Sequence, residues 1–201
     1  TSADQRAGRA GREGPGEVVR VFSRDEYAKM QPDITPEILT ADLTAAALTM
    51  AAWGSPDLPL LDAPPDLTEA EHNHEAIGAL DGGTITDLGK RLATLPLDPR
   101  LGAALLEFGA QAAPTVARLA GDADPKRLAR LVEDKGPAPA GEVIASAFPQ
   151  WIAKKVGDEY QLASGTRAAF NSRAEWIAAA EVQRTKGGAV IREAEPIAFP
   201  Q

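Results

Sequence analysis

The sequence predicts a protein of mixed α and β structure that is mainly α, with a small β domain after its helices. Two observations lead to this fold class. Apolar residues recur at helical spacing through most of residues 31–149. After Trp151, short apolar runs are separated by Gly, Ser and Asn positions, which favours a small antiparallel sheet or barrel. The 201 residues are enough for one to three small domains.

The composition excludes several classes of protein. With 44% hydrophobic and 25% charged residues, the chain resembles globular proteins that bury a core. It has no cysteine, which excludes disulfides and thiolate metal sites and agrees with a cytoplasmic location. No apolar run approaches the roughly 20 residues that span a bilayer, so we expect no membrane role.

The net charge of −8 is concentrated in the middle of the chain. Residues 31–149 carry eight basic and eighteen acidic side chains, whereas the two charge types are nearly balanced in residues 1–30 and 150–201. Binding to the phosphates of a nucleic acid requires accessible positive charge. We therefore expect any phosphate contact at the two ends of the chain.

The first 30 residues predict a strand and a helical turn. Glu17 to Phe22 is a short run with β-branched residues after Gly14-Pro15-Gly16, so we expect a strand after a turn. Ser23 then stands where its side chain can accept a hydrogen bond from the free N–H groups of a first helical turn.

Residues 31–97 predict the outline of a winged helix, with helices, a tight turn and a short β segment. Thr35-Pro36-Glu37 combines the capping hydroxyl and the first-turn proline of a helix start. Thr68 and Glu71 have the spacing of a capping box. Asp81-Gly82-Gly83 predicts the tight turn. The helices expected here span residues 42–53, 68–80 and 87–95, with a proline-rich connector over residues 54–67.

Residues 98–149 predict a helical bundle, and residues 150–201 predict a small β domain. Asp98-Pro99 has the features of a helix start. Gly136-Pro137-Ala138-Pro139 predicts a loop before a last helix over residues 141–148. The strand candidates of the β domain are residues 160–162, 168–170, 176–182 and 189–194.

The most informative part of the sequence is the string Gln5-Arg6-Ala7-Gly8-Arg9-Ala10-Gly11-Arg12. Its three arginines lie three residues apart, and glycines directly precede Arg9 and Arg12, so the backbone can approach a ligand closely. A guanidinium stays protonated and can bind phosphate oxygens through two N–H groups, so such a cluster suits polyphosphate. From the residues alone, an arginine-rich flexible terminus or a solvated helix start is the alternative.

The full string resembles motif VI of superfamily-two helicases, Q-R-x-G-R-x-G-R, in the form typical of DEAH-type members. The resemblance implies that Gln5 lies near the γ-phosphate and the attacking water, and that Arg9 and Arg12 are arginine fingers. An arginine finger stabilises the charge that grows on a transferring phosphoryl group. The resemblance assigns the role of Arg6 less clearly.

Later motifs follow in the order of the accessory region of DEAH helicases. They are Pro36-Glu37-Ile38, Asp62-Ala63-Pro64-Pro65, Ile77-Gly78-Ala79-Leu80-Asp81, Leu88-Gly89 and Leu95-Pro96-Leu97-Asp98-Pro99-Arg100-Leu101. Ala147-Phe148-Pro149 and Glu175-Trp176 resemble one bacterial branch of the family. The implied domains are the end of a RecA-like motor domain at 1–30, a winged helix at 31–97, a helical bundle at 98–149 and an OB-like antiparallel β domain at 150–201. The segment 109–140 departs from the family in being short and Ala-rich, which bears on the size of the bundle.

The resemblance implies an ATP-dependent RNA helicase whose intact form uses ATP and Mg²⁺. The sequence contains no G-x-x-x-x-G-K-[ST] phosphate loop and no Asp-Glu-x-His motif. We therefore expect ATP and Mg²⁺ to be held mainly by residues absent from this chain, as part of a longer protein. The chain alone should neither bind ATP tightly nor hydrolyse it, and no cofactor is expected in it. The sequence leaves the oligomeric state open.

Single-stranded RNA, or DNA, is the partner that the resemblance implies for the intact protein. Lys154, Lys155 and Arg167 are the candidate contacts to this strand, with exposed solubilising side chains as the alternative. A non-catalytic winged-helix module for nucleic-acid binding or scaffolding is the competing function. It predicts a basic recognition helix, whereas the helices expected over residues 42–53 and 68–80 contain no lysine or arginine.

The sequence predicts no metal site. His72 and His74 are two residues apart, so on a helix they point in different directions and cannot share a metal ion. We expect both histidines to be solvated or weakly packed. The acidic residues between positions 122 and 134 lack the spacing and the number of ligands of a calcium loop.

Overall fold

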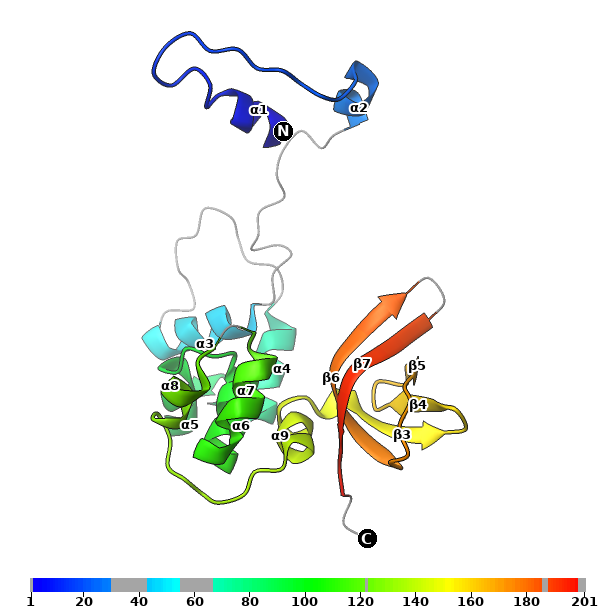
Figure 1. Cartoon of the computed structure of the whole chain (residues 1–201). Coiled ribbons are helices and arrows are strands. Elements are labelled where there is room, and N and C mark those ends of the chain that lie inside the picture. The colour runs from blue at the N-terminus through cyan, green and yellow to red at the C-terminus, as the bar shows by residue number, and fades with distance from the viewer. Residues whose placement is uncertain (1, 30–42, 55–66, 122, 186–187, 199–201) are drawn as a thin grey trace. The chain divides into compact units, whose positions relative to one another are not determined.

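The computed structural model describes residues 2–29, 43–54, 67–121, 123–185 and 188–198 (Figure 1). The chain divides into two compact units: unit 1 is Thr1–Leu43 with Pro59–Asp66, and unit 2 is Thr44–Leu58 with Leu67–Gln201. No helix among the described residues is long and apolar enough to cross a bilayer. The helix start expected at residues 35–37, and residues 55–66 of the expected connector, lie outside the described residues.

Unit 1 contains two short helices, α1 (Ser2–Ala7) and α2 (Arg24–Lys29), joined by turns and irregular backbone. The strand expected from Glu17 to Phe22 is wrong, because this run has no strand conformation and no paired neighbour among the described residues. Val19 and Val21 are 86% and 95% exposed. A strand needs a neighbour that takes up its backbone hydrogen bonds, and β-branched residues alone do not provide one.

A capping box begins α2, which confirms the serine cap expected at Ser23. The backbone N–H of Glu26 donates to Ser23 Oγ at 3.2 Å. In return, the Glu26 carboxylate accepts from the Ser23 backbone N–H at 2.7 Å and from the Ser23 hydroxyl at 2.9 Å. The backbone N–H, and then the hydroxyl, of Ser23 lower the pKa of Glu26, because both favour the charged carboxylate.

The first part of unit 2 has the helix, helix, hairpin and helix order of a winged helix. Its elements are α3 (Thr44–Trp53), α4 (Thr68–Ala76), β1 (Leu80–Asp81), β2 (Thr84–Ile85) and α5 (Asp87–Ala93). Gly82 and Gly83 form the hairpin turn with φ values of 52° and 78°, a backbone conformation that favours glycine. Leu48, Ala79 and Leu92 form the small buried core of this part.

Two expectations for α4 are wrong. Leu67 occupies the N-cap position, so Thr68 is the first helical residue instead of the cap of a box with Glu71. His74 is fully buried instead of solvated, and its Nε2 donates a hydrogen bond to the Thr44 carbonyl oxygen at 2.7 Å. A buried imidazole needs such a partner. This hydrogen bond joins α4 to the start of α3.

The helical bundle of unit 2 is built from short helices. They are α6 (Pro99–Phe108), the 3-10 turn η2 (Ala110–Ala112), α7 (Ala113–Leu119), α8 (Pro125–Ala129) and α9 (Ala140–Ala147). As expected, Asp98 caps α6, and its carboxylate accepts from the Arg100 backbone N–H at 2.9 Å. Val116 and Val143 are fully buried in the bundle core. The Ala-rich segment 109–140 thus contributes short helices that pack closely.

The last part of unit 2 follows the 3-10 turn η3 (Pro149–Trp151) and is a closed five-stranded barrel, ordered β3-β4-β5-β7-β6. Its strands are β3 (Ile152–Val156), β4 (Glu159–Leu162), β5 (Arg167–Ala169), β6 (Trp176–Thr185) and β7 (Gly188–Pro196). This architecture is OB-like. The expectation of an antiparallel domain is wrong at one pairing, because β5 and β7 are parallel. Strand β3 was not expected, since Lys154 and Lys155 interrupt its apolar pattern.

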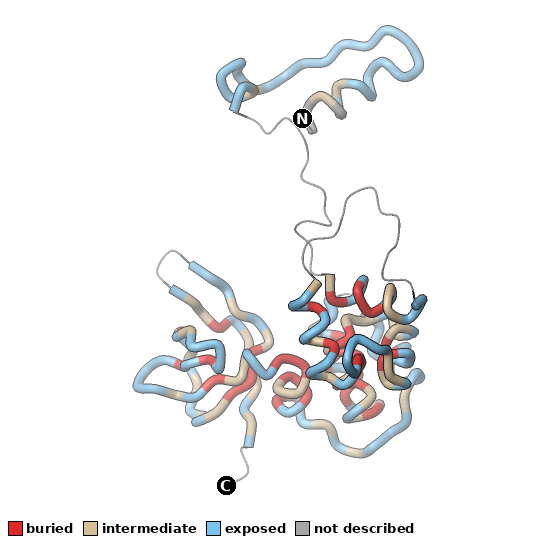
Figure 2. Tube along the Cα trace, turned by 180° about the vertical axis from the view of Figure 1, so that it is seen from behind, coloured by how far each residue is buried: buried red, intermediate tan, exposed pale blue. Residues whose placement is uncertain are grey.

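Helix α9 packs against the barrel through a close approach of two backbones. A Cβ atom at Gly141 would overlap the carbonyl oxygen of Pro196, so only glycine fits this contact. Arg118 of α7 pairs with Glu193 and Glu195 of β7, at 2.7 and 3.3 Å. Buried residues gather in the helices and in the barrel of unit 2 (Figure 2). The bundle and the barrel therefore belong to one compact unit.

We expect Gly141→Ala to lower the free energy of unfolding by about 1–3 kcal/mol, because an extra methyl group in a packed contact forces the backbones apart. Thermal and urea denaturation followed by circular dichroism measure the change. Gly11→Ala is the matched control, since a Cβ atom there meets nothing within 4 Å. Equal stability of the two variants and the unchanged chain would contradict the close approach of α9 to β7.

We expect Ser23→Ala to raise the pKa of Glu26 part of the way to its ordinary value, because the variant loses the hydroxyl and keeps the backbone N–H. The lowered pKa means that this cap stabilises α2 at neutral pH and is lost as the pH falls through the folded-state pKa. A carbon-13 NMR titration of the Glu26 carboxyl measures both effects. Ser23→Thr keeps the hydroxyl and should titrate like the unchanged chain; a shift as large as that of Ser23→Ala would argue against the cap.

Candidate functional site

The candidate site of unit 1 is the arginine loop, residues 8–19, which follows α1. The N–H of Arg9 still donates to the Arg6 carbonyl oxygen at 3.1 Å, so the loop begins as a continuation of the last helical turn. The chain then leaves the helix axis and runs as turns and irregular backbone. Arg9 and Arg12 are both exposed in this loop.

Asp4 holds the two ends of the arginine loop together. Its Oδ1 pairs with the Arg20 guanidinium at 3.0 Å, and its Oδ2 accepts from the Tyr27 hydroxyl at 2.7 Å. The Arg20 guanidinium also lies 5.1 Å from the centre of the Tyr27 ring. The Arg20 and Asp4 side chains are 47% and 40% exposed, so this ion pair contributes only about 0.2–1 kcal/mol. The three groups together connect α1 to α2.

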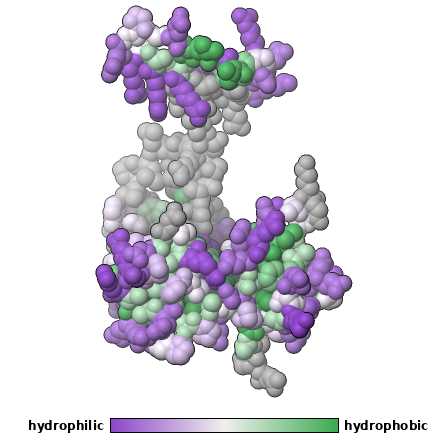
Figure 3. All heavy atoms as spheres, in the orientation of Figure 1, coloured by the Kyte–Doolittle hydropathy of each residue, from purple (hydrophilic) through white to green (hydrophobic). Residues whose placement is uncertain are grey.

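The arginine loop is closed on one side and open on the other. A Cβ atom at Gly16 would overlap the Ala10 carbonyl oxygen, which shows that the loop folds back on itself. A Cβ atom at Gly11 would meet nothing within 4 Å, so the backbone between the two arginines is accessible. A hollow of about 560 Å³ is lined by Arg9, Ala10, Arg12, Glu13, Gly14 and Pro15. The surface of unit 1 seen in Figure 3 is mostly hydrophilic.

The structure brings Arg9 and Arg12 to one hollow, where two guanidiniums can bind a polyphosphate. Neither side chain forms an ion pair with another described residue, so an anion would displace no ion pair within the described part of the chain. Gln5 lies in α1, but its side chain is outside the described part of the chain. The sequence did not predict the contacts by which Asp4 connects the two ends of the arginine loop, because the partners of Asp4 lie 16 and 23 residues away.

The barrel separates the basic residues that the sequence grouped together. Lys154 and Arg167 are exposed on β3 and β5. Lys155 is only partly exposed, and its Nζ donates to the Ser172 carbonyl oxygen at 2.6 Å. Lys154 Nζ lies 3.9 Å from Glu175 Oε1, at the limit of an ion pair. The assignment of the three basic residues to a nucleic-acid strand remains a prediction.

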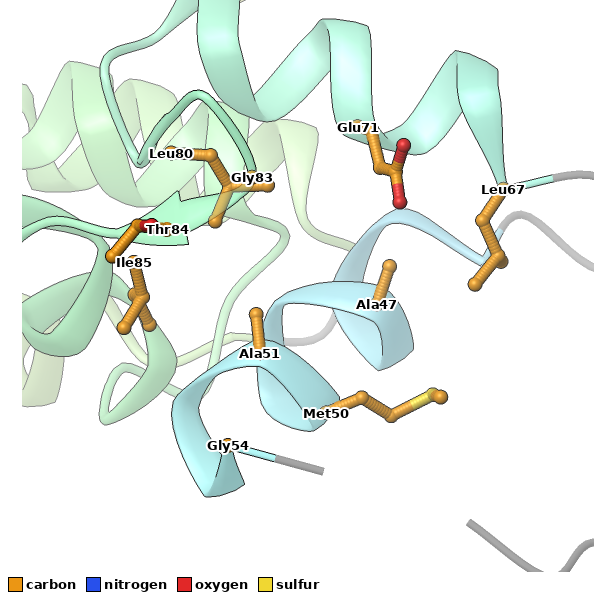
Figure 4. A pocket seen from close by; sticks show the side chains of 10 residues that line it. All are labelled: Ala47, Met50, Ala51, Gly54, Leu67, Glu71, Leu80, Gly83, Thr84 and Ile85. Carbon is orange, nitrogen blue, oxygen red and sulfur yellow. The ribbon is translucent and has the colours of Figure 1, made fainter. Parts of the chain in front are cut away.

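The winged-helix part contains a further hollow of about 390 Å³ beside α3 and the β1-β2 hairpin (Figure 4). Its lining is mostly apolar and includes Met50 and Ile85, with Glu71 as the charged side chain. No group of three His, Cys, Asp or Glu side chains that could hold a metal ion is present among the described residues. This hollow therefore offers mainly apolar packing surface, with the carboxylate of Glu71 at its edge.

We expect Asp4→Asn to speed amide hydrogen exchange in the arginine loop, because the variant weakens the contacts that hold its two ends. Hydrogen exchange followed by mass spectrometry resolves this loop from unit 2. Asp87→Asn removes the same charge from the exposed Lys90 pair of α5 and should leave the loop unchanged. Equal exchange of the loop in both variants would show that Asp4 does not hold it.

Comparisons with known proteins point to helicases. Residues 75–97 match the family described as helicase associated domain (HA2), winged-helix. The ATP-dependent RNA helicase HrpB of Escherichia coli (strain K12) is 31% identical over an aligned length of 219 residues. This match covers 89% of this chain and 27% of HrpB. The pre-mRNA-splicing factor ATP-dependent RNA helicase prp22 of Schizosaccharomyces pombe is 39% identical over 111 residues, which cover 52% of this chain and 10% of prp22. The chain thus spans about a quarter or less of these relatives.

Two crystal structures of Escherichia coli HrpB, described as a DExH-box NTPase and as a DEAH/RHA helicase, resemble the chain. Their TM-scores are 0.76 and 0.80, at 27% and 26% sequence identity. The matches cover 98% and 100% of this chain, and 30% and 31% of the HrpB chains. These findings confirm the predicted resemblance to DEAH-type helicases and to a bacterial branch of that family. Over nearly its whole length the chain is similar to the C-terminal region of DEAH-type RNA helicases.

Proposed function

We propose that this chain acts as the C-terminal region of an ATP-dependent RNA helicase, in which Arg9 and Arg12 contact the γ-phosphate of ATP. Residues 1–30 form the edge of a RecA-like motor domain. ATP and Mg²⁺ bind mainly to residues outside this sequence, which contains no phosphate loop. The observation that carries the proposal is the pair of exposed guanidiniums in a loop held at both ends by Asp4.

The arginines act by electrostatic stabilisation of the transition state. During phosphoryl transfer, negative charge is spread over the oxygens of the γ-phosphoryl group, and a guanidinium placed there offsets it. Gln5 orients the attacking water, as the family motif implies. An open backbone at Gly11 lets the phosphate approach between Arg9 and Arg12. Loss of the γ-phosphate after hydrolysis removes the partner of both guanidiniums, which couples the nucleotide state to the position of this loop.

The strand that the motor moves is single-stranded RNA. HrpB and prp22 are both named as RNA helicases, and the barrel of this chain is of a type that binds oligonucleotides. Lys154 and Arg167 contact the phosphates directly, because both are exposed. Lys155 supports the site by holding the Ser172 carbonyl oxygen.

A non-catalytic winged-helix module is the second candidate function. Such a module reads nucleic acid with a basic helix. Helix α4 instead exposes Glu69, Glu71 and Glu75, and neither α3 nor α4 contains a lysine or an arginine. A scaffolding role without a motor would also leave the arginine motif without a ligand. These observations favour the helicase.

The test is ATP hydrolysis by the helicase polypeptide that contains this chain. We expect Arg9→Ala or Arg12→Ala to reduce kcat by about 10³–10⁵-fold, because an arginine finger contributes that much. Arg9→Lys should also lose most activity, since an ammonium cannot bind two phosphate oxygens in the guanidinium geometry. A malachite green assay of released phosphate measures the rates.

Arg24→Ala is the matched control for these arginine variants. Arg24 is exposed on α2 of the same unit, so its loss changes the net charge equally and should leave kcat within a factor of about two. Turnover that survives in Arg9→Ala and Arg12→Ala, with normal folding by circular dichroism, would remove the finger assignment.

A further inference from the structure

Tyr27 of α2 contacts groups at both ends of the arginine loop. Its hydroxyl donates to Asp4 Oδ2 at 2.7 Å, which connects it to α1, before the loop. Arg20 directly follows the loop, and its guanidinium lies 5.1 Å from the centre of the Tyr27 ring. The Phe22 ring lies parallel to the Tyr27 ring, with 6.0 Å between the ring centres and an angle of 4° between the planes. The two ends of the loop therefore meet at the Tyr27 side chain.

Asp4 connects Tyr27 to Arg9 through the backbone that continues α1. The Asp4 carbonyl oxygen accepts from the Gly8 N–H at 2.9 Å, and Gly8 directly precedes Arg9. About one helical turn thus separates the carboxylate that Tyr27 holds from Arg9. The Arg9 N–H donates to the Arg6 carbonyl oxygen at 3.1 Å in the same turn. A shift of Asp4 consequently moves the backbone that carries the Arg9 guanidinium.

The returning end of the loop provides a second connection to the arginines. A Cβ atom at Gly16 would overlap the Ala10 carbonyl oxygen, so these two backbones are in contact. Ala10 lies between the two exposed arginines of the hollow. Four residues after Gly16, the guanidinium of Arg20 pairs with Asp4 and lies over the Tyr27 ring. The contacts of Tyr27 therefore act on the loop from both of its ends.

Helix α2 gives Tyr27 a defined position. The Tyr27 N–H donates to the Ser23 carbonyl oxygen at 3.0 Å, in the turn that the capping box of Ser23 and Glu26 begins. Helix α2 has no buried residue. Its position consequently depends on this cap and on the ring and hydroxyl contacts of Tyr27, instead of on packing in a core.

The contacts of Asp4 also direct its negative charge away from Arg9. One carboxylate oxygen of Asp4 pairs with Arg20, and the other accepts from the Tyr27 hydroxyl. A carboxylate close to an arginine competes with phosphate for the N–H groups of the guanidinium. With both oxygens of Asp4 engaged, the Arg9 guanidinium stays available to an anion.

We propose that Tyr27 is a positioning residue for the arginine fingers, which it holds toward the γ-phosphate through Asp4. This inference rests on the proposed function, in which Arg9 contacts that phosphate. Tyr27 itself touches neither the nucleotide nor the attacking water and acts through Arg9. A displacement of about 1 Å is enough to cost a catalytic group much of its effect. The competing interpretation is that Tyr27 only stabilises the fold of unit 1.

The experiment is steady-state ATP hydrolysis by the helicase polypeptide that contains this chain, with the variant Tyr27→Phe. The variant keeps the ring and the charges and removes the hydrogen bond to Asp4. We expect kcat to fall about tenfold, because a hydrogen bond to a charged group that aligns Arg9 is lost. The KM for ATP should stay within a factor of about two, since an interaction made only in the transition state does not contribute to ground-state binding.

A double-variant cycle with Arg9 separates positioning from folding. In the Arg9→Ala background, Tyr27→Phe should lower kcat by less than about twofold, because no Arg9 guanidinium is left to position. A general loss of stability in unit 1 would instead lower kcat by the same factor in both backgrounds. Phosphate released from ATP that is radiolabelled on the γ-phosphate measures these slow rates.

Two further variants complete the test. Asp4→Ala removes the acceptor of the same hydrogen bond, so it should lower kcat at least about tenfold with little change in KM. It tests the role of Tyr27 even if Tyr27→Phe is unstable. Tyr160→Phe is the matched control, because it removes a hydroxyl that donates to the Ala174 carbonyl oxygen in the barrel of unit 2. Without RNA, its kcat should stay within a factor of about two.

The outcomes distinguish this inference from the proposed function. An unchanged kcat in Tyr27→Phe that is folded by circular dichroism overturns the positioning role, and so does an equal loss in both backgrounds. If Arg9→Ala loses hydrolysis while Tyr27→Phe retains it, the proposed function stands and only the role of Tyr27 fails. If Arg9→Ala retains hydrolysis, the finger assignment fails, and the role of Tyr27 fails with it.

Discussion

The parallel pairing of β5 with β7 closes the barrel, and the position of every outward side chain on it depends on that closure. The pairing is short, with Ala168 opposite Ala189 and Ala169 opposite Val190. A closed barrel leaves no edge along which these strands can slip, and a slip of one residue would turn every side chain to the other face. Small residues inside, such as Ala153 and Ala168, let the backbones come together, while Lys154 and Arg167 remain in solvent.

The two units are stabilised in different ways. In unit 2, close backbone packing at Gly141 and the Arg118 ion pairs join the helical bundle to the barrel. These contacts favour motion of the bundle and the barrel as one body. In unit 1, helix α2 has no buried residue, and the polar contacts of Asp4 with Arg20 and Tyr27 connect the elements. A unit with so little buried surface supports the proposal that it is the edge of a larger domain.

The residues of the two candidate sites could be predicted from the sequence to different degrees. The arginine motif is a local string, so its residues could be identified without any knowledge of the fold. The contacts that hold its loop, from Asp4 to Arg20 and Tyr27, span 16 and 23 residues and leave no local signal. In the barrel, sequence reasoning identified Lys154 and Arg167 but grouped them with Lys155. It did not separate Lys155 from the other two, because cross-strand register depends on which strands pair, and no residue carries that information by itself.

Local chemistry in the sequence determined the helix starts at Ser23 and Asp98, the glycine turn of the hairpin, and the family motif. These features depend on a residue's own backbone preferences and on neighbours within a few positions. Only the tertiary structure decided that the run from Glu17 to Phe22 is not a strand, that His74 is buried against Thr44, and that one strand pair of the barrel is parallel. Each of these depends on a partner distant in the sequence, and the free energy of strand pairing and burial exists only once that partner is in place.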